Sequence, residues 1–304
     1  MVKTKISFPE SFFHEETRNG YTVTSEMKKV WAIELDLLSE LDRVCKKLEL
    51  KYFLFAGTML GAVRDQHFIP WDDDIDVIMF REEYDKLLEF GPAEFSDPYF
   101  LQTGYTDVGY FRASSQLRNS HTAGILLPDE GKRVKFNQGI FLDIYVLDGV
   151  SLDQNELKKQ IDEENKLRQL YFYMYQPFSN IALYRIIKQV RSKLLMLKYK
   201  DLSKLYSQLE MTAKRFSDSD YVDVIEYRQN PDNVLLFERK WFQESIQMEF
   251  EGFSFPVPKD YDKVLSLHFG SDYMTPRQLP SDHGRTMHVL FDTDRSYLEV
   301  LKEL

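Results

Sequence analysis

The chain has 304 residues, of which 43% are hydrophobic and 14% aromatic, so it can bury a large core. A formal net charge of −10 argues against broad nucleic-acid binding, and a single cysteine excludes an internal disulfide framework. The sequence has no apolar run of about 18 residues, the length that would span a membrane. Its first residues contain no apolar signal region, so we expect a cytoplasmic protein.

The first regular elements are predicted from apolar spacing. Apolar residues recur at helical intervals over 25–48, which predicts a helix with Ser25 as its N-cap. Residues 51–55 are predicted to form a strand, because Lys51 is followed by the apolar and aromatic run Y-F-L-F, and a second helix is predicted to begin at Leu60.

A glycine and a hydroxyl residue lie between that strand and that helix. At Gly57 the backbone N–H groups can approach a phosphate, and the following helix N-terminus favours an anion. Thr58 can cap the helix or donate its hydroxyl to the phosphate. Alone, such a pair is an ordinary turn, so its meaning depends on the acidic residues that follow.

An Asp-x-Asp pattern opens the next apolar strand, predicted over 75–80. Side chains alternate along a strand, so Asp74 and Asp76 fall on one face, where two carboxylates need a cation between them. Oxygen ligands of this kind suit Mg²⁺ or Mn²⁺. Asp72 shares the parity of Asp74, so the ligand pair could be shifted by one step, and Asp72 with Asp73 could also form a solvated acidic turn.

Further strands carry a third acid. A helix is predicted over 81–90, ended by a Gly-Pro pair, and strands follow at about 99–105, 110–126 and 139–147. Asp143 lies in the middle of the last strand. It could complete a metal site or accept a proton from an attacking hydroxyl, although a buried lone aspartate can also be a structural hydrogen-bonding group.

Residues 152–217 are predicted to be helical, and their charge changes along the chain. The segment 181–204 contains seven lysines and arginines and one acid, beside an apolar stripe. A basic amphipathic helix can lie on an anionic membrane surface, so we expect peripheral contact with the inner membrane face through 181–204. The alternative is a core-packing helix with a solvated cationic face.

Three blocks of the sequence resemble one known family. Residues 57–77 read G-T-M-L-G-A-V-R-x-x-x-F-I-P-W-D-D-D-I-D-V and are similar to the signature of the LicD family, which includes the fukutin-type proteins. Residues 139–148, G-I-F-L-D-I-Y-V-L-D, resemble the second family block, and residues 255–265 with 269–274 resemble the C-terminal block. Together these blocks cover roughly residues 30–150 and 235–290.

The resemblance implies an α+β fold, with a nucleotidyltransferase-like mixed β-sheet core that is flanked by helices and carries a helical insertion. Residues 1–150 would form the catalytic core with its N-terminal helix. Residues 151–220 would form the helical insertion, and 221–304 a C-terminal α/β part that completes the catalytic domain.

The resemblance also implies an activity. Family members transfer a phospho-alcohol from a CDP-activated donor to a glycan hydroxyl and release CMP. We therefore expect a metal-dependent transferase of phosphocholine from CDP-choline, acting in lipopolysaccharide, teichoic acid or capsule modification, with a free or lipid-linked glycan acceptor. Alternatives are phosphoribitol or phosphoglycerol transfer, NMP transfer from an NTP, and non-catalytic binding of a glycan or nucleotide.

The resemblance places the metal and catalytic residues at Asp74, Asp76 and Asp143, and makes Gly57 and Thr58 the equivalent of a Gly-Ser turn. Six residues are expected to bind substrate: Gly57, Thr58, Arg64, Trp71, Arg118 and His283. The two arginines would hold the pyrophosphate, the tryptophan could face a choline ammonium through cation–π attraction, and the histidine could close over the nucleotide. Surface ion pairs, core packing and a structural histidine are the respective alternatives.

Overall fold

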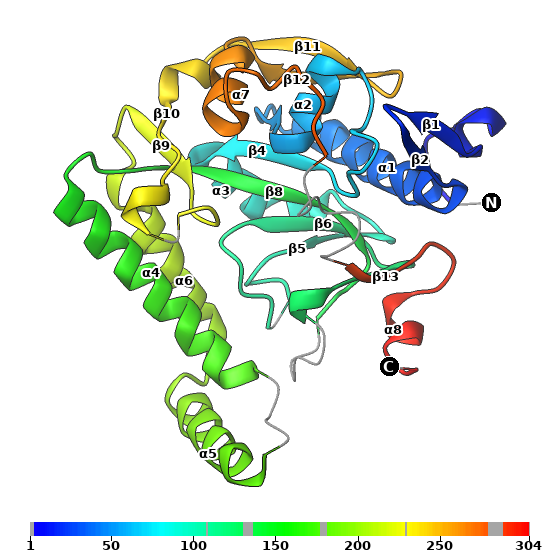
Figure 1. The fold of residues 1–304 in the computed structure, drawn as a ribbon. Coiled ribbons are helices and arrows are strands. Elements are labelled where there is room, and N and C mark those ends of the chain that lie inside the picture. The colour runs from blue at the N-terminus through cyan, green and yellow to red at the C-terminus, as the bar shows by residue number, and fades with distance from the viewer. Residues whose placement is uncertain are drawn as a thin grey trace.

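The centre of the molecule is a seven-stranded mixed sheet built around its longest strand, β8 (Ile140–Gly149). We describe it from a computed structural model, which covers residues 3–107, 109–129, 136–176, 181–228, 230–278 and 288–303 (Figure 1). One edge of β8 pairs with β4 (Asp76–Phe80) in parallel. Its other edge pairs antiparallel with β6 (Ser115–Asn119) and then with β9 (Tyr221–Val224).

Three short strands extend this sheet: β3 (Phe53–Leu54) beside β4, β5 (Tyr99–Gln102) beside β6, and β10 (Phe237–Glu238) beside β9. Strands that are far apart in the sequence, from β3 to β10, therefore share one sheet. With helices packed around it, this arrangement confirms the predicted α+β fold with a mixed sheet.

Helix α1 (Ser25–Lys47) packs along the sheet and is almost entirely buried on its apolar positions. Its N-cap is Thr24, whose side chain accepts a hydrogen bond from the backbone N–H of Met27 at 3.2 Å. The prediction of Ser25 as the cap was wrong by one residue. Both hydroxyl residues fit the cap by type, and the backbone leaves the extended region only after Thr24.

Two further predictions need correction. Helix α2 (Ala56–Arg64) begins four residues earlier than Leu60, whereas α3 (Arg81–Phe90) lies where it was expected. The strand predicted over 110–126 is two strands, β6 and β7 (Ala123–Leu126), because Thr122 turns the chain. Its N–H and its hydroxyl both bond to the carbonyl of Asn119, at 3.2 and 2.8 Å. Strand β7 then pairs with β13 (His288–Asp292) instead of the central sheet.

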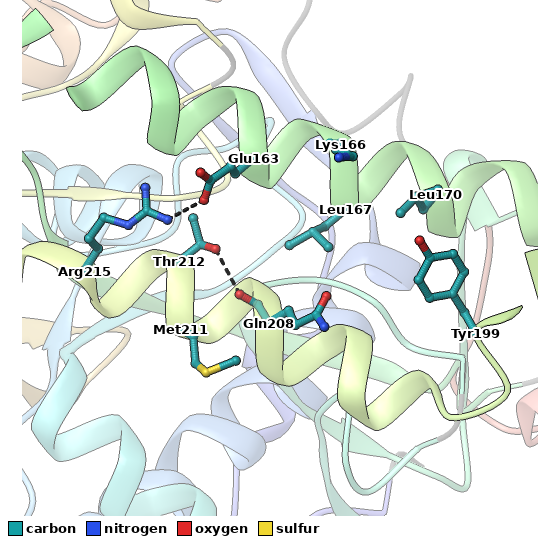
Figure 2. Close-up of a pocket in the computed structure, with 9 residues that line it drawn as sticks. All are labelled: Glu163, Lys166, Leu167, Leu170, Tyr199, Gln208, Met211, Thr212 and Arg215. Carbon is teal, nitrogen blue, oxygen red and sulfur yellow. Dashed lines mark hydrogen bonds and ion pairs between the residues drawn. The ribbon is translucent and has the colours of Figure 1, made fainter. Parts of the chain in front are cut away.

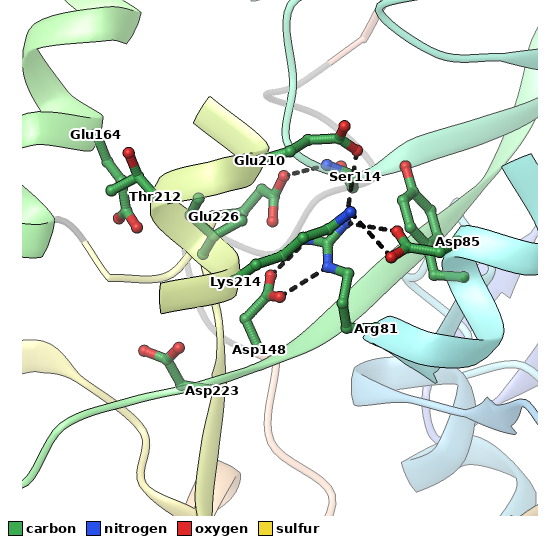
Figure 3. A network of polar contacts seen from close by, with 12 residues as sticks. Arg81, Asp85, Ser114, Asp148, Glu164, Glu210, Thr212, Lys214, Asp223 and Glu226 are labelled. Atoms are coloured by element: carbon green, nitrogen blue, oxygen red, sulfur yellow. Dashed lines mark hydrogen bonds and ion pairs between the residues drawn. The ribbon is translucent and has the colours of Figure 1, made fainter. Parts of the chain in front are cut away.

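Residues 151–220, which the sequence predicts to be a helical insertion and which we call the insertion, contain α4 (Gln154–Tyr175), α5 (Ala182–Lys198) and α6 (Leu202–Ala213). Buried ion pairs join α4 and α6 to the sheet region, and Figure 3 shows those around Arg81. Arg81 at the start of α3 forms a bidentate pair with Asp148 at 2.7 and 2.8 Å and approaches Glu210 of α6 at 3.5 Å. Arg228 pairs in the same way with Glu164 of α4 and also reaches Asp223 at 2.7 Å.

The remaining elements surround this body. Near the N-terminus a small hairpin is formed by β1 (Glu16–Arg18) and β2 (Tyr21–Val23). A second hairpin, β11 (Ser245–Phe250) with β12 (Phe253–Pro258), leads into α7 (Tyr261–Phe269), which lies beside α2 in Figure 1. Helix α8 (Tyr297–Val300) ends the described chain. None of the helices in the described ranges is both long and apolar enough to cross a membrane.

Candidate functional site

The pairing of two parallel strands brings the predicted acids together. Asp76, the first residue of β4, is directly opposite Asp143 of β8, and the N–H of Asp143 bonds to the carbonyl of Ile75 at 2.9 Å. Asp74 precedes β4 by two residues. One carboxylate oxygen from each of the three aspartates lies within 4.8 Å of the other two. The sequence prediction that these acids share one site therefore agrees with their positions.

Trp31 of α1 holds the loop that carries Asp72, Asp73 and Asp74. The indole N–H of Trp31 donates to the carbonyl of Asp72 at 3.1 Å, and the Trp31 ring stacks on Phe68 at 4.4 Å. The three loop aspartates form a second group whose carboxylate oxygens lie within 4.8 Å of one another. Both ligand sets that the sequence left open are therefore geometrically available, and Asp74 belongs to each.

Helix α2 begins against this loop. Thr58 does not cap it: Phe55 occupies the N-cap position, and the Thr58 hydroxyl accepts a hydrogen bond from the backbone N–H of Asp76 at 2.8 Å. Gly57 lets the Asp72 carboxylate approach the backbone closely, because a Cβ at this position would lie 2.4 Å from Oδ2 of Asp72 and displace it. The helix N-terminus, which favours negative charge, is thus held next to the aspartate loop.

Burial makes ionisation of these acids costly. Burial, together with the charges of Asp74 and Asp143, raises the pKa of Asp76 well above its usual value. Burial raises the pKa of Asp143 to about 6, against the opposing effect of Arg112 and with a further contribution from Asp74. Glu34 of α1 is also buried next to the loop, and burial with the loop aspartates raises its pKa. The site therefore concentrates negative charge that a bound cation would stabilise.

The donor set fits a hard divalent cation. Among the described residues, no donor lies within hydrogen-bonding distance of Oδ1 of Asp76, although this atom is buried. Neither Asp76 nor Asp143 forms an ion pair with a described lysine or arginine. A buried carboxylate oxygen without a partner is costly, and Mg²⁺ prefers such oxygens. The residues present therefore match the expected metal.

Arg118 lies behind the site rather than in it. It is fully buried, and its three guanidinium nitrogens donate to the side chains of Gln102 and Gln116 and to the carbonyl of Gly139. Gln116 in turn donates to Oδ1 of Asp143 at 2.8 Å. The structure thus gives Arg118 neither the predicted contact with a pyrophosphate nor the alternative surface ion pair. It holds the amide that orients Asp143.

Asp72, Asp74 and Asp76 line a pocket of about 340 Å³, which we call the acid pocket; Asp143 is opposite Asp76 in the sheet but is not one of the lining residues. Its lining residues come from four regions of the sequence: Ala56, Gly57, Ile69, Trp71, Asp72, Asp74, Asp76, Tyr145, Tyr227, His268 and Phe269. Sequence reasoning missed Tyr145, Tyr227 and His268. Tyr145 could have been found, because it is two residues after Asp143 and so lies on the same face of β8.

His268 contributes a neutral polar group to this wall. Burial lowers its pKa to about 4, and no described group bonds to its Nδ1. Its ring stacks on Phe269 at 4.4 Å and lies 5.6 Å from the ring of Tyr227. The acid pocket thus combines carboxylates on one side with aromatic rings on the other.

A second pocket of about 190 Å³ adjoins the first and shares Ile69, Trp71 and Phe269 with it. We call it the arginine pocket, because it is also lined by Arg64 and Arg277. Arg64 is paired with Asp65 at 2.9 Å, and Arg277 is paired with Asp272. Two predicted substrate-binding residues, Arg64 and Trp71, therefore lie next to the acids, whereas His283 lies outside the described residues.

A groove of about 370 Å³ lies far from the acids, between α4 and α6 (Figure 2). Its polar contacts are an ion pair between Arg215 and Glu163 and a hydrogen bond from the Thr212 hydroxyl to the carbonyl of Gln208 at 3.0 Å. None of the predicted site residues lines it. The chemistry of the described chain is thus concentrated at the acid pocket.

Comparison with known proteins agrees with this location. Residues 49–140, which include Asp74 and Asp76, match the family model described as "LicD/FKTN/FKRP, nucleotidyltransferase domain". The lipopolysaccharide cholinephosphotransferase LicD of Haemophilus influenzae is 23% identical over 254 residues, which cover 84% of this chain and 92% of that protein.

Two uncharacterized Rickettsia proteins share a shorter segment. The protein from Rickettsia prowazekii is 39% identical over 77 residues, or 25% of this chain and 26% of its own length. The protein from Rickettsia typhi is 38% identical over 72 residues, or 23% of this chain and 20% of its own length. The family-model match over residues 49–140 and the similarity along most of the chain to a LicD protein together support the LicD family.

Proposed function

We propose that this protein is a metal-dependent transferase that moves phosphocholine from CDP-choline to a hydroxyl group of a glycan and releases CMP. The observation that carries the proposal is the cluster of Asp74, Asp76 and Asp143, at the point where strands β4 and β8 begin to pair. The similarity to a lipopolysaccharide cholinephosphotransferase supports the reaction class. It also supports a lipopolysaccharide-like acceptor.

The acids explain how such a transfer would be assisted. A divalent cation such as Mg²⁺, held by Asp74, Asp76 and Asp143, would supply positive charge to the diphosphate of the donor. No described lysine or arginine lines the acid pocket, so the side chains of the pocket itself do not provide that charge. Arg64 and Arg277 line the adjoining arginine pocket, where each is paired with an aspartate.

In the transfer itself, the glycan hydroxyl oxygen forms a bond to the choline-bearing phosphorus. The bond from that phosphorus to the bridging oxygen breaks, and the electron pair leaves with CMP. Gln116 fixes one oxygen of Asp143 at 2.8 Å, so this carboxylate is oriented to accept the hydroxyl proton. Without a bound cation, burial raises the pKa of this carboxyl to about 6.

The walls of the acid pocket favour phosphocholine over phosphoribitol or phosphoglycerol. Trp71, Tyr145, Tyr227 and Phe269 present aromatic rings close to the acids. Ring faces attract a quaternary ammonium through cation–π interaction, whereas ribitol or glycerol would need polar groups that match their hydroxyls. The aromatic lining therefore supports choline as the transferred alcohol.

The test is CMP release with Mg²⁺ from CDP-choline, CDP-ribitol, CDP-glycerol and CDP-ethanolamine, each with and without a glycan acceptor. We expect CDP-choline to be used fastest and Asp74→Asn to reduce turnover by about a thousandfold or more, since metal and phosphate positioning provide most of the rate. Asp218→Asn is the matched control, because this exposed aspartate forms no ion pair with a described residue. Pyrophosphate release from an NTP would instead establish NMP transfer, and ligand binding without turnover would establish a binding protein.

A further inference from the structure

Helix α5 has two different faces. On one face the Ser192 hydroxyl donates to the carbonyl of Met174 in α4 at 2.8 Å, and Leu195 and Met196 pack against the hydrophobic cluster of the insertion. Ser192 is the only buried residue of this helix. The contacts that attach α5 to the described part of the protein therefore use one side of it.

The opposite face carries an apolar stripe that the described residues do not cover. Its side chains are 53–66% exposed: Leu183, Ile186, Ile187, Val190, Leu194 and Leu197. They recur every three or four residues, so at 3.6 residues per turn they form one continuous band. Figure 1 shows α5 at the extremity of the molecule, beyond α4 and α6 and away from the sheet. A band of this size on an exposed helix indicates an interaction surface.

Cations border this band on both sides. Helix α5 carries five lysines and arginines and no acid, although the whole chain has a net charge of −10. At 100° per residue, Lys193 falls on one border of the band, and Arg191 with Lys198 falls on the other. Within the described ranges, no acid lies within ion-pair distance of Lys188, Lys193 or Lys198. Their charge is thus available to an external partner.

This pattern distinguishes between partners. An apolar band bordered on both sides by long cationic side chains matches the interface of a bilayer, where the band enters the acyl boundary and the cations reach the phosphates. A second copy related by a twofold axis would instead bring Lys193 and Lys198 near the like charges of the partner α5. We propose that α5 docks the protein on an anionic lipid surface, with the apolar band inserted and the lysines at the headgroups.

The docking goes beyond the proposed transfer reaction and can be tested without it. The full chain is mixed with vesicles of phosphatidylcholine alone or with 30% phosphatidylglycerol, and the bound fraction is measured by flotation. We expect binding to the anionic vesicles, and weaker binding as salt is raised. Ile187→Ser with Leu194→Ser should reduce partitioning by roughly tenfold or more, because two large apolar side chains no longer enter the bilayer.

Charge and apolar area have separate matched controls. Lys193→Glu with Lys198→Glu, one at each border of the band, should abolish the preference for anionic vesicles. The same reversals at the exposed Lys3 and Lys51, neither of which pairs with a described acid, should change it much less. Leu152→Ser with Leu298→Ser removes two equally exposed leucines elsewhere and should leave binding unchanged.

Three results would overturn the proposal. The first is equal partitioning of the parent and the Ile187→Ser, Leu194→Ser variant, and the second is equal binding to neutral and anionic vesicles. The third is a stable dimer in sedimentation equilibrium that this double variant dissociates, since a second copy would then cover the band. Asp74→Asn should bind vesicles like the parent, so a failure of the transferase assay does not affect this test.

Discussion

Strand β8 carries two buried charge clusters that are constructed in opposite ways. Near its start, Asp143 joins Asp74 and Asp76, and all three groups are acids. Near its end, Asp148 lies in a bidentate ion pair with Arg81 (Figure 3). Arg228, which pairs with Glu164 and Asp223, is close to this pair. Only the second cluster supplies its own countercharge.

The difference separates a structural role from a ligand-binding one. Burial opposes the charge of Arg81, but Asp148 more than compensates and raises its pKa. In the acid cluster, burial and neighbouring charges act in the same direction on Asp76 and disfavour ionisation. The paired cluster joins α4 and α6 to the sheet, whereas the acid cluster contains no direct ion pair among its members, which is the basis for the metal site that we propose.

The largest effect is expected from matched Asp→Asn changes in the two clusters. Asp148→Asn leaves the buried Arg81 without its bidentate partner and should lower the free energy of unfolding by about 3–5 kcal/mol. Asp143→Asn removes a repelling charge and should not destabilise the metal-free protein at pH 7.5. Urea denaturation of both variants measures this contrast. Equal destabilisation would show that the acid cluster is also structural.

The pH dependence of stability should reverse when metal is added. The folded-state pKa of Asp143, about 6, is raised from 3.8, so its stabilising contribution is complete below about pH 4 and is lost as pH rises through about 6. With EDTA, we expect the free energy of unfolding to fall by on the order of 1–3 kcal/mol between pH 4.5 and 7. Mg²⁺ binds the ionised form, so its stabilisation should grow over the same range. A metal effect that is independent of pH would contradict this.

A smaller effect is expected where neutral hydrogen bonds position the acids. Thr58→Val keeps the shape of the side chain but leaves the N–H of Asp76 without its acceptor, which should cost about 1–3 kcal/mol. Thr58→Ser retains the oxygen and serves as the control. Thermal unfolding gives the stability, and calorimetric Mg²⁺ titration gives the affinity. If the two variants behave alike, the hydroxyl does not hold the acid end of β4.

The smallest stability effect is expected for Gly57→Ala, because the better helix propensity of alanine offsets part of the strain. The new Cβ would displace the Asp72 carboxylate, which lies 2.4 Å from its position. If Asp72 binds the metal, Mg²⁺ affinity should fall by roughly tenfold, and the effect should disappear in an Asp72→Ala background. Unchanged affinity would identify Asp74, Asp76 and Asp143 as the metal ligands.

The sequence predicted the bounds of those helices and strands that depend on neighbouring residues alone. The strand at Asp76–Phe80 and the helix at Arg81–Phe90 were predicted almost to the residue, because apolar runs and a following Gly-Pro pair specify them. The start of α2 was missed because Ala56 adopts a positive φ of 44°, a conformation that its residue type does not suggest.

The acid pair was predictable, but the rest of the pocket was not. Asp74 and Asp76 are close in sequence, so strand parity was enough to bring them together. Tyr227 follows β9 and His268 lies in α7, and only the pairing of β9 with β8 and the packing of α7 beside α2 bring them to the acids. The burial of Arg118 was not predicted for a related reason. Strand parity does not reveal that Gln102 and Gln116 surround its guanidinium group.

The wall shared by the acid and arginine pockets has an optical consequence. Trp71 forms part of both pockets and is 9% exposed, while the chain contains only three tryptophans. An occupant of either pocket would change the surroundings of this indole, so its fluorescence reports binding without an added label. Trp241 lines neither pocket and provides an internal reference, whereas Trp31 bonds to the carbonyl of Asp72 and is part of the support of the site. Donor binding can therefore be followed in real time on the unmodified protein, before any acceptor is known.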